Sequence, residues 1–411
     1  MRKTLLISLA MIFSTAFCGG LRAQGAIHSG APPKVPGVVI DHSAAASGRY
    51  IGSPSIVILS DGDYLASHDF FGPQSGSKTC ATTEIFRSTD RGRTWQKRAQ
   101  VKCAFWSNHF VHRGAVYLMG ATAENGDLVI RRSRDDGRTW TNPVSASTGL
   151  LATGHWATGP TPVVEHDGRL WRAFEKVNIH LRWGKQFLAG MLSAPAKANL
   201  LVRSNWTFSN FLPRNPKWLD GDFGGWLEGN AVVAPDGKVV DVLRVDVSHL
   251  PELAAIVPIS ANGRKASFNP ATGFIHFRGG ATKFTIRPDP RGPGYWSLAD
   301  IVTPQTAGDI GSHVKPAQIR NTLALVYSPD LRHWHVRSII LHHPDITHHA
   351  FQYVDWHFDG NDLVAAIRTA YNDGLGGAHT YHDANYLTFY RIRNFRSLKT
   401  KPQARGGQPN P

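Results

Sequence analysis

The chain has 411 residues, of which 18% are charged, 42% are apolar and 10% are aromatic. This balance excludes a disordered chain, and the length allows one large domain or two to three ordinary ones. The 45 Lys and Arg residues outnumber the 30 Asp and Glu residues and give a formal net charge of +15. The charge favours an acidic partner without telling nucleic acid, membrane and polysaccharide apart. The 40 Gly, 25 Pro and 12 Trp residues favour an all-β fold with many tight turns.

Residues 1–23 are predicted to be a secretory signal peptide. A basic pair at 2–3 precedes an apolar run over 5–17, and a small-residue cleavage motif ends at Ala23. The apolar run is too short to span a bilayer, and no later stretch of the sequence is long enough to do so. We therefore expect the mature chain to be secreted or periplasmic.

A single domain is expected between two loop-like segments. Residues 24–48 have the composition of a linker, and residues 399–411 form a basic tail that we expect to be disordered. No shift in composition divides residues 49–398. Cys80 and Cys103 remain after removal of the signal peptide, and an oxidising compartment permits a disulfide between them, with two buried free thiols as the alternative.

An eight-residue motif recurs in this domain and gives the strongest indication of fold. Residues 88–95 and 133–140 share the pattern S-x-D-x-G-x-T-W, and residues 328–334 are a degenerate third copy. In such a hairpin turn the Asp accepts hydrogen bonds from backbone N–H groups, the Gly takes a positive φ, and the Trp packs over the turn. We therefore expect these Asp residues to be structural rather than catalytic.

Short alternating strand patterns, separated by Asp-Gly and similar turns, divide the domain into six units. The prediction is an all-β fold: a single β-propeller with six four-stranded antiparallel blades, an architecture that leaves only short, protected sheet edges. A propeller with seven blades is the alternative, because residues 178–225 and 266–282 are poorly patterned and could hold a further blade. Val38–Ile40 could pair with the last unit and close the ring.

The repeated turns resemble the Asp boxes of the sialidase superfamily of β-propellers. The resemblance implies a site at the central mouth, with Tyr353 as nucleophile, Glu228 assisting it, and Arg244 and Arg320 gripping a substrate carboxylate. A structural ion pair with a core Tyr is the alternative interpretation. Gly52 stands where the superfamily has the first Arg of its carboxylate-binding triad, so that ligand is missing.

The superfamily's acid/base Asp would be expected after the first hairpin, where Ser67-His68-Asp69 stand. Residues 52–73 also resemble the propeller enzymes that remove terminal rhamnose from glucuronate and, more distantly, the ulvan lyases. That resemblance implies His68 as general acid/base, with a core histidine as the alternative. No second His follows at 82–84, which favours hydrolysis over a two-histidine elimination.

Further residues are predicted to contact substrate around the mouth: Tyr117, Arg132, His155, Trp156, Arg368, His379 and His382. The last three flank or lie in a loop crowded with Gly, His and aromatic residues, a composition that is a functional hint. The His and Asp spacing at 379–383 fits no standard zinc signature. No cofactor is predicted, and a structural divalent cation such as calcium stays open. His342, His343, His348 and His349 are expected in exposed loops.

The sequence thus predicts a secreted carbohydrate-active enzyme, a glycoside hydrolase that is exo-acting on acidic glycans and cleaves a terminal sugar such as rhamnose from a uronate. A polysaccharide lyase is not excluded. The alternatives are an exo-α-sialidase that has replaced its first Arg, and a non-catalytic glycan-binding propeller. The expected partner is an acidic oligo- or polysaccharide. Nucleic acid is not expected, because no cationic cluster interleaves with aromatic residues. We expect a monomer without membrane insertion.

Overall fold

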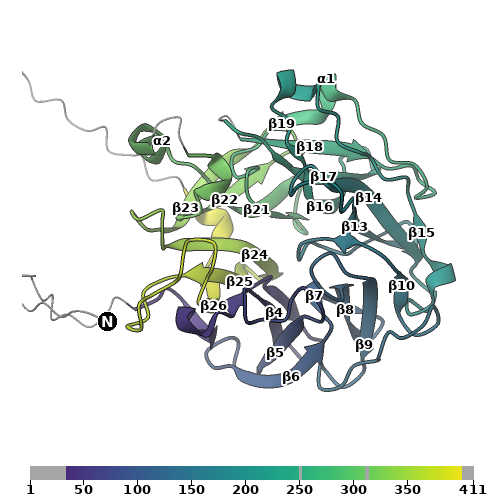
Figure 1. Ribbon diagram of the computed structural model, residues 1–411, viewed down its shortest axis with the longest axis horizontal. Helices are drawn as coiled ribbons and strands as arrows, with labels where there is room; N and C mark the ends of the chain where they lie inside the picture. Colours follow the sequence, from purple (N-terminus) through teal and green to yellow (C-terminus); the bar gives the residue numbers. More distant parts are fainter. Residues whose placement is uncertain (1–33, 250–251, 311–313, 400–411) are drawn as a thin grey trace, which may run out of the picture. The chain divides into compact units, whose positions relative to one another are not determined.

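The computed structural model describes residues 34–249, 252–310 and 314–399, which form six antiparallel sheets around a central axis (Figure 1). The predicted all-β propeller with six blades is confirmed. The stretches 178–225 and 266–282 hold the outer strands of the third and fourth blades instead of a seventh blade. The predicted signal peptide lies outside the described residues, as does the tail beyond Lys399.

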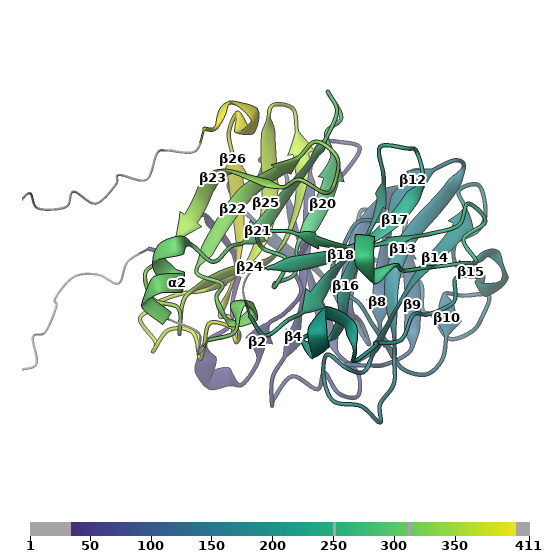
Figure 2. The same cartoon turned by 90° about the horizontal axis from the view of Figure 1, so that it is seen from above.

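The first three blades follow one another along the chain. Figure 2 shows the six sheets in a view turned by 90° from that of Figure 1. The first blade consists of β2 (Tyr50–Ile51), β3 (Ser55–Ile58), β4 (Tyr64–Phe71), β5 (Thr82–Ser88) and β6 (Gln96–Lys102). The second consists of β7 (Phe105–His112), β8 (Ala115–Ala121), β9 (Leu128–Ser133) and β10 (Leu150–Ala152). The third consists of β11 (Trp156–Ala157), β12 (Val164–His166), β13 (Arg169–Val177), β14 (Phe187–Pro195) and β15 (Thr207–Phe208).

The last three blades continue the ring. The fourth consists of β16 (Gly225–Val233), β17 (Val239–Asp246), β18 (Leu253–Pro258) and β19 (Phe274–His276). The fifth consists of β20 (Thr285–Pro288), β21 (Tyr295–Asp300), β22 (Thr322–Ser328) and β23 (His335–His342). The sixth consists of β24 (Ala350–Asp359), β25 (Asp362–Ala370), β26 (Tyr386–Ile392) and, from the start of the described chain, β1 (Val38–His42).

Strand β1 closes the ring as the outermost strand of the sixth blade. It runs antiparallel to β26, with Val38 opposite Phe389 and His42 opposite Tyr386. The sheet order is therefore β1-β26-β25-β24. Two segments more than 300 residues apart are joined in this way, at the position where the sequence suggested a closing strand.

The inner strand is divided in two in the first blade, where β2 and β3 both pair with β4. Between them lies Gly52-Ser53-Pro54, and a proline has no N–H to donate to a ladder. The interruption frees the backbone N–H of Ser53 for a side-chain acceptor. The third blade has the same kind of break, with β11 and β12 both paired to β13.

The apolar core lies mainly between neighbouring blades. Ile56 and Tyr64 of the first blade, for example, pack in one cluster with Val364 and Leu387 of the sixth. Burying one such aliphatic side chain stabilises the fold by about 1.5–3 kcal/mol. The sheets are thus held together by their faces, which leaves the ends of the inner strands free to form a site.

The repeated eight-residue motif forms the turn that its sequence predicts. In the first copy the Asp90 carboxylate accepts hydrogen bonds from the backbone N–H and the hydroxyl of Thr94 at 2.9 and 2.6 Å. Gly92 has φ of 87°, and a Cβ there would overlap the Phe389 ring of the sixth blade. Trp95 packs on the same ring, at 5.6 Å between centroids. The turn therefore joins one blade to its neighbour.

The other two copies repeat this pattern. Asp135 accepts from the backbone N–H and the hydroxyl of Thr139 at 2.8 and 2.7 Å. In the degenerate copy the carboxylate of Asp330 contacts Nδ1 of His333 at 2.6 Å, so an imidazole replaces the Thr hydroxyl. None of the three carboxylates lines the central cleft that is described below.

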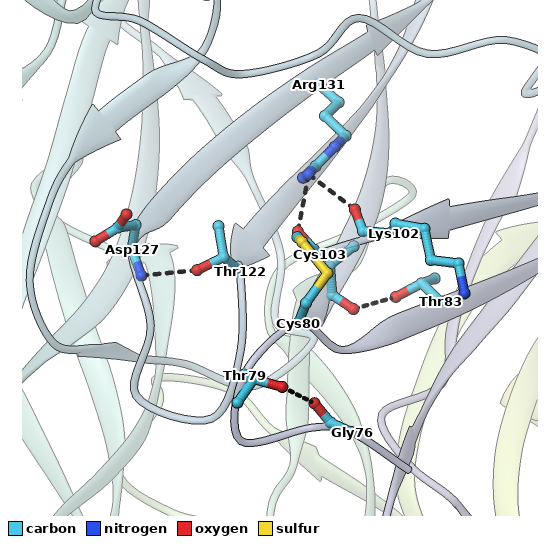
Figure 3. Close-up of a disulfide and its surroundings, with 10 residues drawn as sticks. Gly76, Thr79, Cys80, Thr83, Lys102, Cys103, Thr122, Asp127 and Arg131 are labelled. Carbon is cyan, nitrogen blue, oxygen red and sulfur yellow. Dashed lines mark hydrogen bonds between the residues drawn. A yellow bond between two sulfur atoms is a disulfide. The ribbon is translucent and has the colours of Figure 1, made fainter.

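Cys80 and Cys103 form a disulfide, which Figure 3 shows with its surroundings. It ties the β4–β5 connection to the β6–β7 connection. Arg131 of β9 donates hydrogen bonds to the carbonyl oxygens of Lys102 and Cys103 at 3.1 and 2.8 Å. Covalent and polar contacts thus fix the segment that leads directly to Trp106.

The described helices are short and lie in the connections between strands: α1 (Pro270–Gly273), α2 (Pro304–Ile310), η1 (Ala45–Ser47), η2 (Arg203–Asn205), η3 (Trp218–Gly221), η5 (Pro316–Gln318) and η6 (Phe395–Ser397). Among the described residues, no helix has the length and apolar character that crossing a membrane requires.

Candidate active site

A cleft of about 560 Å³ opens where the inner strands begin, and all six blades contribute to its wall. One lining residue from each blade, in chain order, is Asp69, Trp106, Trp183, Arg244, Arg320 and Tyr353. Most of these side chains are ionisable or aromatic. The cleft is therefore suited to a polar ligand with a flat or charged face.

Bulges at the start of three inner strands aim side chains at this cleft. The register shifts between Phe105 and Asn108 in β7, around Glu228 in β16, and around Tyr353 in β24. Trp106 and Tyr353 have φ of 47° and 56°, a left-handed conformation that is uncommon for bulky residues. A β-bulge bends its strand and redirects a side chain, and such strained positions cluster at functional sites.

Tyr353 and Glu228 form a hydrogen-bonded pair at the base of the cleft. The Tyr353 hydroxyl donates to Oε1 of Glu228 at 2.8 Å. Burial, followed by the nearby Glu228 charge, raises the pKa of Tyr353 above its ordinary value. Burial also works to raise the pKa of Glu228, but the Arg244 charge and the bond from Tyr353 outweigh it and lower that pKa. The pair is therefore a neutral phenol held by a carboxylate base.

Three arginines surround this pair: Arg244 of β17, Arg320 just before β22, and Arg368 of β25. Arg244 Nη1 lies 3.2 Å from Oε2 of Glu228. The guanidinium carbons of Arg320 and Arg368 lie 5.7 and 4.9 Å from the centre of the Tyr353 ring. Burial lowers the pKa of Arg368 to about 10, so the group stays protonated at neutral pH.

Two of these guanidinium groups keep buried donors without a partner. Among the described residues, Nη2 of Arg244 and Nε of Arg368 are buried and have no hydrogen-bond partner. A buried donor left unsatisfied costs roughly 1–3 kcal/mol, and more when the group is charged. Both arginines line the cleft, and the positive charge of their guanidinium groups favours an anionic ligand there.

Asp69 of the first blade also lines the cleft and has the properties of a general acid. Its carboxylate accepts hydrogen bonds from the backbone N–H of Ser53 at 2.7 Å and of Trp106 at 2.5 Å. Burial nevertheless raises the pKa of Asp69 to about 6. The carboxyl group is thus partly protonated near neutral pH, the state that a proton donor requires.

Gly52 is needed for this position of Asp69. A Cβ on residue 52 would lie 1.7 Å from Oδ1 of Asp69. No larger residue, Arg included, can therefore stand at 52 while Asp69 occupies this place. Arg368 of the neighbouring sixth blade lies close to this part of the first blade, with its guanidinium carbon 4.5 Å from the centre of the Phe71 ring.

His68 does not line the cleft. Successive side chains on a strand point to opposite faces, so Asp69 faces the cleft and His68 faces the space between blades. The ring is fully buried, with Nε2 2.8 Å from the Asp41 carboxylate and Nδ1 2.9 Å from the carbonyl oxygen of Asp69. This geometry is that of the core histidine given above as the alternative.

The remaining predicted residues divide between the cleft and other places. Arg244, Arg320, Arg368 and His382 line the cleft with Tyr353. Burial, followed by the Arg368 charge, lowers the pKa of His382 to about 4, which keeps the imidazole neutral.

The other predicted contacts lie outside this cleft. Tyr117 and Arg132 line a separate groove. His155 is exposed and contacts the carbonyl oxygen of Asn125, whereas Trp156 is buried in the core between the second and third blades. His379 is exposed and contacts the Asp383 carboxylate at 2.8 Å. The face of a blade to which each side chain points depends on where its strand begins and ends, and the sequence alone does not give these bounds.

A small side pocket of about 60 Å³ adjoins the Tyr353–Glu228 pair. Its wall is largely apolar and includes Trp106, Trp183 and Leu227, with Glu175 as a further member. Burial, followed by the charge of nearby Asp241, raises the pKa of Glu175 well above its ordinary value. The pocket thus offers a largely apolar wall, with the Glu228 carboxylate at one side, and is large enough for a methyl-sized substituent.

Sequence reasoning missed Asp69, Trp106 and Trp183 as cleft residues. Asp69 had a signal, because an acidic residue after the first hairpin is what the superfamily resemblance implies. Trp106 is recognisable only through its bulge. Trp183 lies in the β13–β14 connection, where no motif marks it. Among the described residues, the group that could hold a metal ion is His343, Asp345 and His349, outside the cleft.

Comparisons with known proteins agree with this architecture. No protein-family model matches the chain, and no curated protein matches it significantly in sequence. Among solved structures, the Hadza microbial sialidase Hz136 superposes with a TM-score of 0.59 and 14% identity, over 87% of this chain and 68% of that one. The intramolecular trans-sialidase of Ruminococcus gnavus gives 0.53 and 14%, over 88% and 98%.

An α-L-arabinanase of Penicillium chrysogenum gives a TM-score of 0.52 and 13% identity, over 88% of this chain and 98% of that one. These three neighbours are glycoside hydrolases by name. The chain therefore has a sialidase-like six-bladed propeller fold. At this identity the similarity establishes the fold alone, and a function has to be argued from the cleft.

Proposed function

We propose that the protein is an exo-acting glycosidase that removes a terminal sugar carrying a carboxylate on its anomeric carbon, as sialic acids do. The carrying observation is the set of three arginines, Arg244, Arg320 and Arg368, that line the cleft together with Tyr353, a tyrosine held by a glutamate. Arginine forks bind carboxylates bidentately. A carboxylate bound there would place its anomeric carbon next to the Tyr353 hydroxyl.

The chemistry follows from the charges around the anomeric carbon. A neutral phenol can approach a carbon that bears a carboxylate without the repulsion that an ionised Asp or Glu nucleophile would meet. Glu228 takes the phenol proton as the Tyr353 oxygen bonds to that carbon. Asp69 donates its proton to the leaving oxygen and afterwards activates water, which releases the sugar with net retention.

The side pocket and the disulfide add support. The apolar pocket beside Tyr353 would take a methyl-bearing substituent of the sugar. The Cys80–Cys103 bond is typical of oxidising compartments, and it supports the prediction that the chain is exported to where such glycans are found.

Cleavage of a terminal sugar from a uronate remains a second candidate. One observation favours it: Arg182, Lys185 and Lys315 line the cleft in addition to the arginines around Tyr353. They would accommodate an acidic sugar on the leaving side. His68 has no part in this candidate, because it lies outside the cleft.

The two candidates separate in a two-substrate assay. Purified protein would be given a 4-methylumbelliferyl sialic acid conjugate and, separately, a rhamnosyl-glucuronate oligosaccharide, with mass analysis of the products. We expect release of the sialic acid, first as the retained anomer by NMR. Release of rhamnose alone would move the assignment to the second candidate.

Tyr353→Phe distinguishes catalysis from binding. It removes the nucleophilic oxygen but keeps the ring on which the arginines pack. We expect kcat to fall by roughly 10⁴–10⁶-fold, because the covalent nucleophile is lost, with ligand affinity little changed in a titration with free sugar. Bound sugar without turnover in the wild-type chain would instead support the non-catalytic glycan-binding alternative.

A further inference from the structure

A second groove, of about 560 Å³, lies at the end of the second blade that is opposite to the cleft. Strand β7 carries Trp106 near its start, where it lines the cleft, and His112 at its end, where it lines this groove. At about 3.3 Å per residue, the two places are about 20 Å apart along the strand. The described lining residues of the groove include no acidic side chain and four cationic ones: Arg113, Arg132, Arg134 and Lys197.

Strand pairing brings the cationic side chains together with a tyrosine. Tyr117 of β8 stands directly opposite Arg132 of β9, so the two side chains share one face of the second blade. Arg134 follows just beyond the end of β9, and Arg113 lies in the tight turn between β7 and β8. Lys197 comes from the third blade, in the connection after β14. The groove thus lies along the boundary between two neighbouring blades.

Contacts between the two blades hold the walls of the groove in place. Nε2 of His112 lies 2.7 Å from the carbonyl oxygen of Ala196, and Nη1 of Arg113 donates to the carbonyl oxygen of Lys197 at 3.0 Å. His112 is buried, with its Nδ1 3.4 Å from the Glu165 carboxylate. These contacts shape the groove before a ligand binds, and preorganisation of this kind favours affinity.

The positive charge of the groove is not neutralised by the part of the protein that the structure describes. Among those residues, the four cationic side chains form no ion pair. The carboxylates that follow Arg134 in sequence have other partners. That of Asp135 accepts from Thr139 at 2.8 and 2.7 Å, and that of Asp136 lies 3.5 Å from Arg87. Like charges in a concave surface focus the electrostatic field and attract anions.

The shape of the groove suits an extended ligand. A neighbouring groove of about 540 Å³ continues from it and shares His112, Arg113 and Lys197 as lining residues. This second part reaches Gly168, in the β12–β13 turn of the third blade. A chain-like anion would therefore contact cationic groups of both blades at once, and linked contacts along one chain strengthen each other.

Tyr117 favours a glycan over a nucleic acid as that anion. Its ring is stacked on Phe110, with 5.1 Å between centroids, and the residue is only 6% exposed. No aromatic face is thus open there for a base to stack on, and such faces are what proteins that bind single-stranded nucleic acid use. The Tyr117 hydroxyl has no hydrogen-bond partner among the described residues, and the hydroxyl groups of a sugar can donate to it and accept from it.

We propose that this groove binds an extended acidic polysaccharide, one that carries carboxylate or sulfate groups along its chain. Arg132 and Arg134 would contact the anionic groups, since guanidinium groups hold such anions with charge-assisted hydrogen bonds. The Tyr117 hydroxyl would bond to a neighbouring sugar. This proposal does not depend on the proposed glycosidase activity, because none of these residues lines the cleft.

Glycan binding can be measured directly on the full chain. Fluorescently labelled oligogalacturonate and a sulfated oligosaccharide, each of about eight sugars, would be titrated at about 0.15 M salt, where diffuse attraction is largely screened. We expect saturable binding of at least one of them and none of uncharged malto-octaose. The anion that binds more tightly identifies the group that the groove prefers. Absence of saturable binding to both would overturn the proposal, and so would tighter binding of single-stranded DNA of equal charge.

Variants locate the site, with Tm as the check that each one folds. Arg132→Gln should weaken binding about 10-fold or more, because a charge-assisted hydrogen bond is lost. Tyr117→Phe keeps the ring and the net charge, and it should weaken binding about threefold. Arg138→Gln is the matched control, because Arg138 is exposed in the same hairpin turn but lies outside the groove.

Two outcomes of this comparison would contradict the assignment. Equal weakening by Arg138→Gln and Arg132→Gln would show that binding depends on net charge alone. Unchanged binding in both Arg132→Gln and Tyr117→Phe would place the glycan in the cleft instead. Loss in the two groove variants with an unchanged control is the result that we expect.

Discussion

At the scale of single residues, the site depends on small differences in side-chain direction. His68 and Asp69 are neighbours in sequence, yet one is a buried hydrogen-bonding partner of Asp41 and the other faces the cleft. The sequence identifies the segment, but it does not tell which of the two side chains faces the cleft. That depends on the strand register, because a shift of one residue moves every side chain to the opposite face of the sheet. Tyr353, Glu228 and the arginines could be predicted from motifs, whereas Trp183 could not, because it lies in the β13–β14 connection and no motif marks it.

The pH dependence of turnover should report the ionisation of Asp69. Because burial raises its pKa to about 6, the acid form is lost as the pH rises through that value. We expect kcat/KM on natural glycans to fall tenfold per pH unit above about 6, and Asp69→Asn to remove this limb together with roughly 10²–10⁴-fold of the rate. A pH–rate profile on a poor leaving group is the measurement. An unchanged alkaline limb in the variant would assign the proton to another group.

The same ionisation affects stability. The folded pKa of Asp69 lies above the ordinary Asp value of 3.8, so the native state binds an extra proton between about pH 4 and 6. The contribution of protonated Asp69 to the free energy of unfolding is therefore complete below the pKa of the unfolded chain. This contribution is lost as the pH rises through about 6. The free energy of unfolding of Asp69→Asn should not show this loss.

Gly52→Ala tests the coupling between the glycine and the acid. The new Cβ would have to displace Asp69, so we expect a loss of kcat close to that of Asp69→Asn. In the double variant the two effects should be strongly non-additive, since both act on one group. Gly292→Ala is the control, because a Cβ there meets no atom within 4 Å. Full activity in Gly52→Ala would refute the coupling.

At the scale of elements, regular features were predictable and irregular ones were not. The S-x-D-x-G-x-T-W motif predicts its own hairpin turn, because every contact that defines it is local. The bulges in β7, β16 and β24 arise from pairing with neighbouring strands, so sequence pattern cannot place them. The candidate site therefore consists of predicted residues brought together by unpredicted distortions of their strands.

The disulfide is an element-scale brace for the site. It holds the segment before Trp106, whose N–H donates to Asp69. The bond joins cysteines 23 residues apart in sequence, and a double Cys80→Ser/Cys103→Ser variant should lose about 3 kcal/mol of unfolding free energy. Urea unfolding with and without reductant measures this loss. The reduced wild type should match the variant, and an unchanged midpoint in both would show that the bond does not brace the fold.

At the scale of the whole molecule, the blade count was predictable because repeated units imply it. Closure of the ring was harder to predict, since it depends on a single short strand in a stretch with the composition of a linker. The +15 charge is consistent with an anionic substrate. The net charge alone does not locate a binding site. The site is located by the arginines that the fourth, fifth and sixth blades bring together.

Ring closure should be sensitive to the buried face of β1. Ile40 is buried against Leu387 and its neighbours, whereas Val39 on the same strand is 41% exposed. Ile40→Ala should cost about 2–5 kcal/mol of unfolding free energy. Val39→Ala, as the control, should change it by less than about 1 kcal/mol. Comparable denaturation midpoints for the two variants would argue that β1 is not needed for closure.

The pairing of β1 with β26 also sets an order of events in time. The sixth sheet needs one strand from each end of the domain, so the ring cannot close while the chain is still being made or transported. Until the last hairpin arrives, β1 and the growing edge are both unpaired and open to other chains. The final folding step therefore requires the complete polypeptide. Chains that end before β26 keep unpaired edge strands, which can pair with other chains and aggregate.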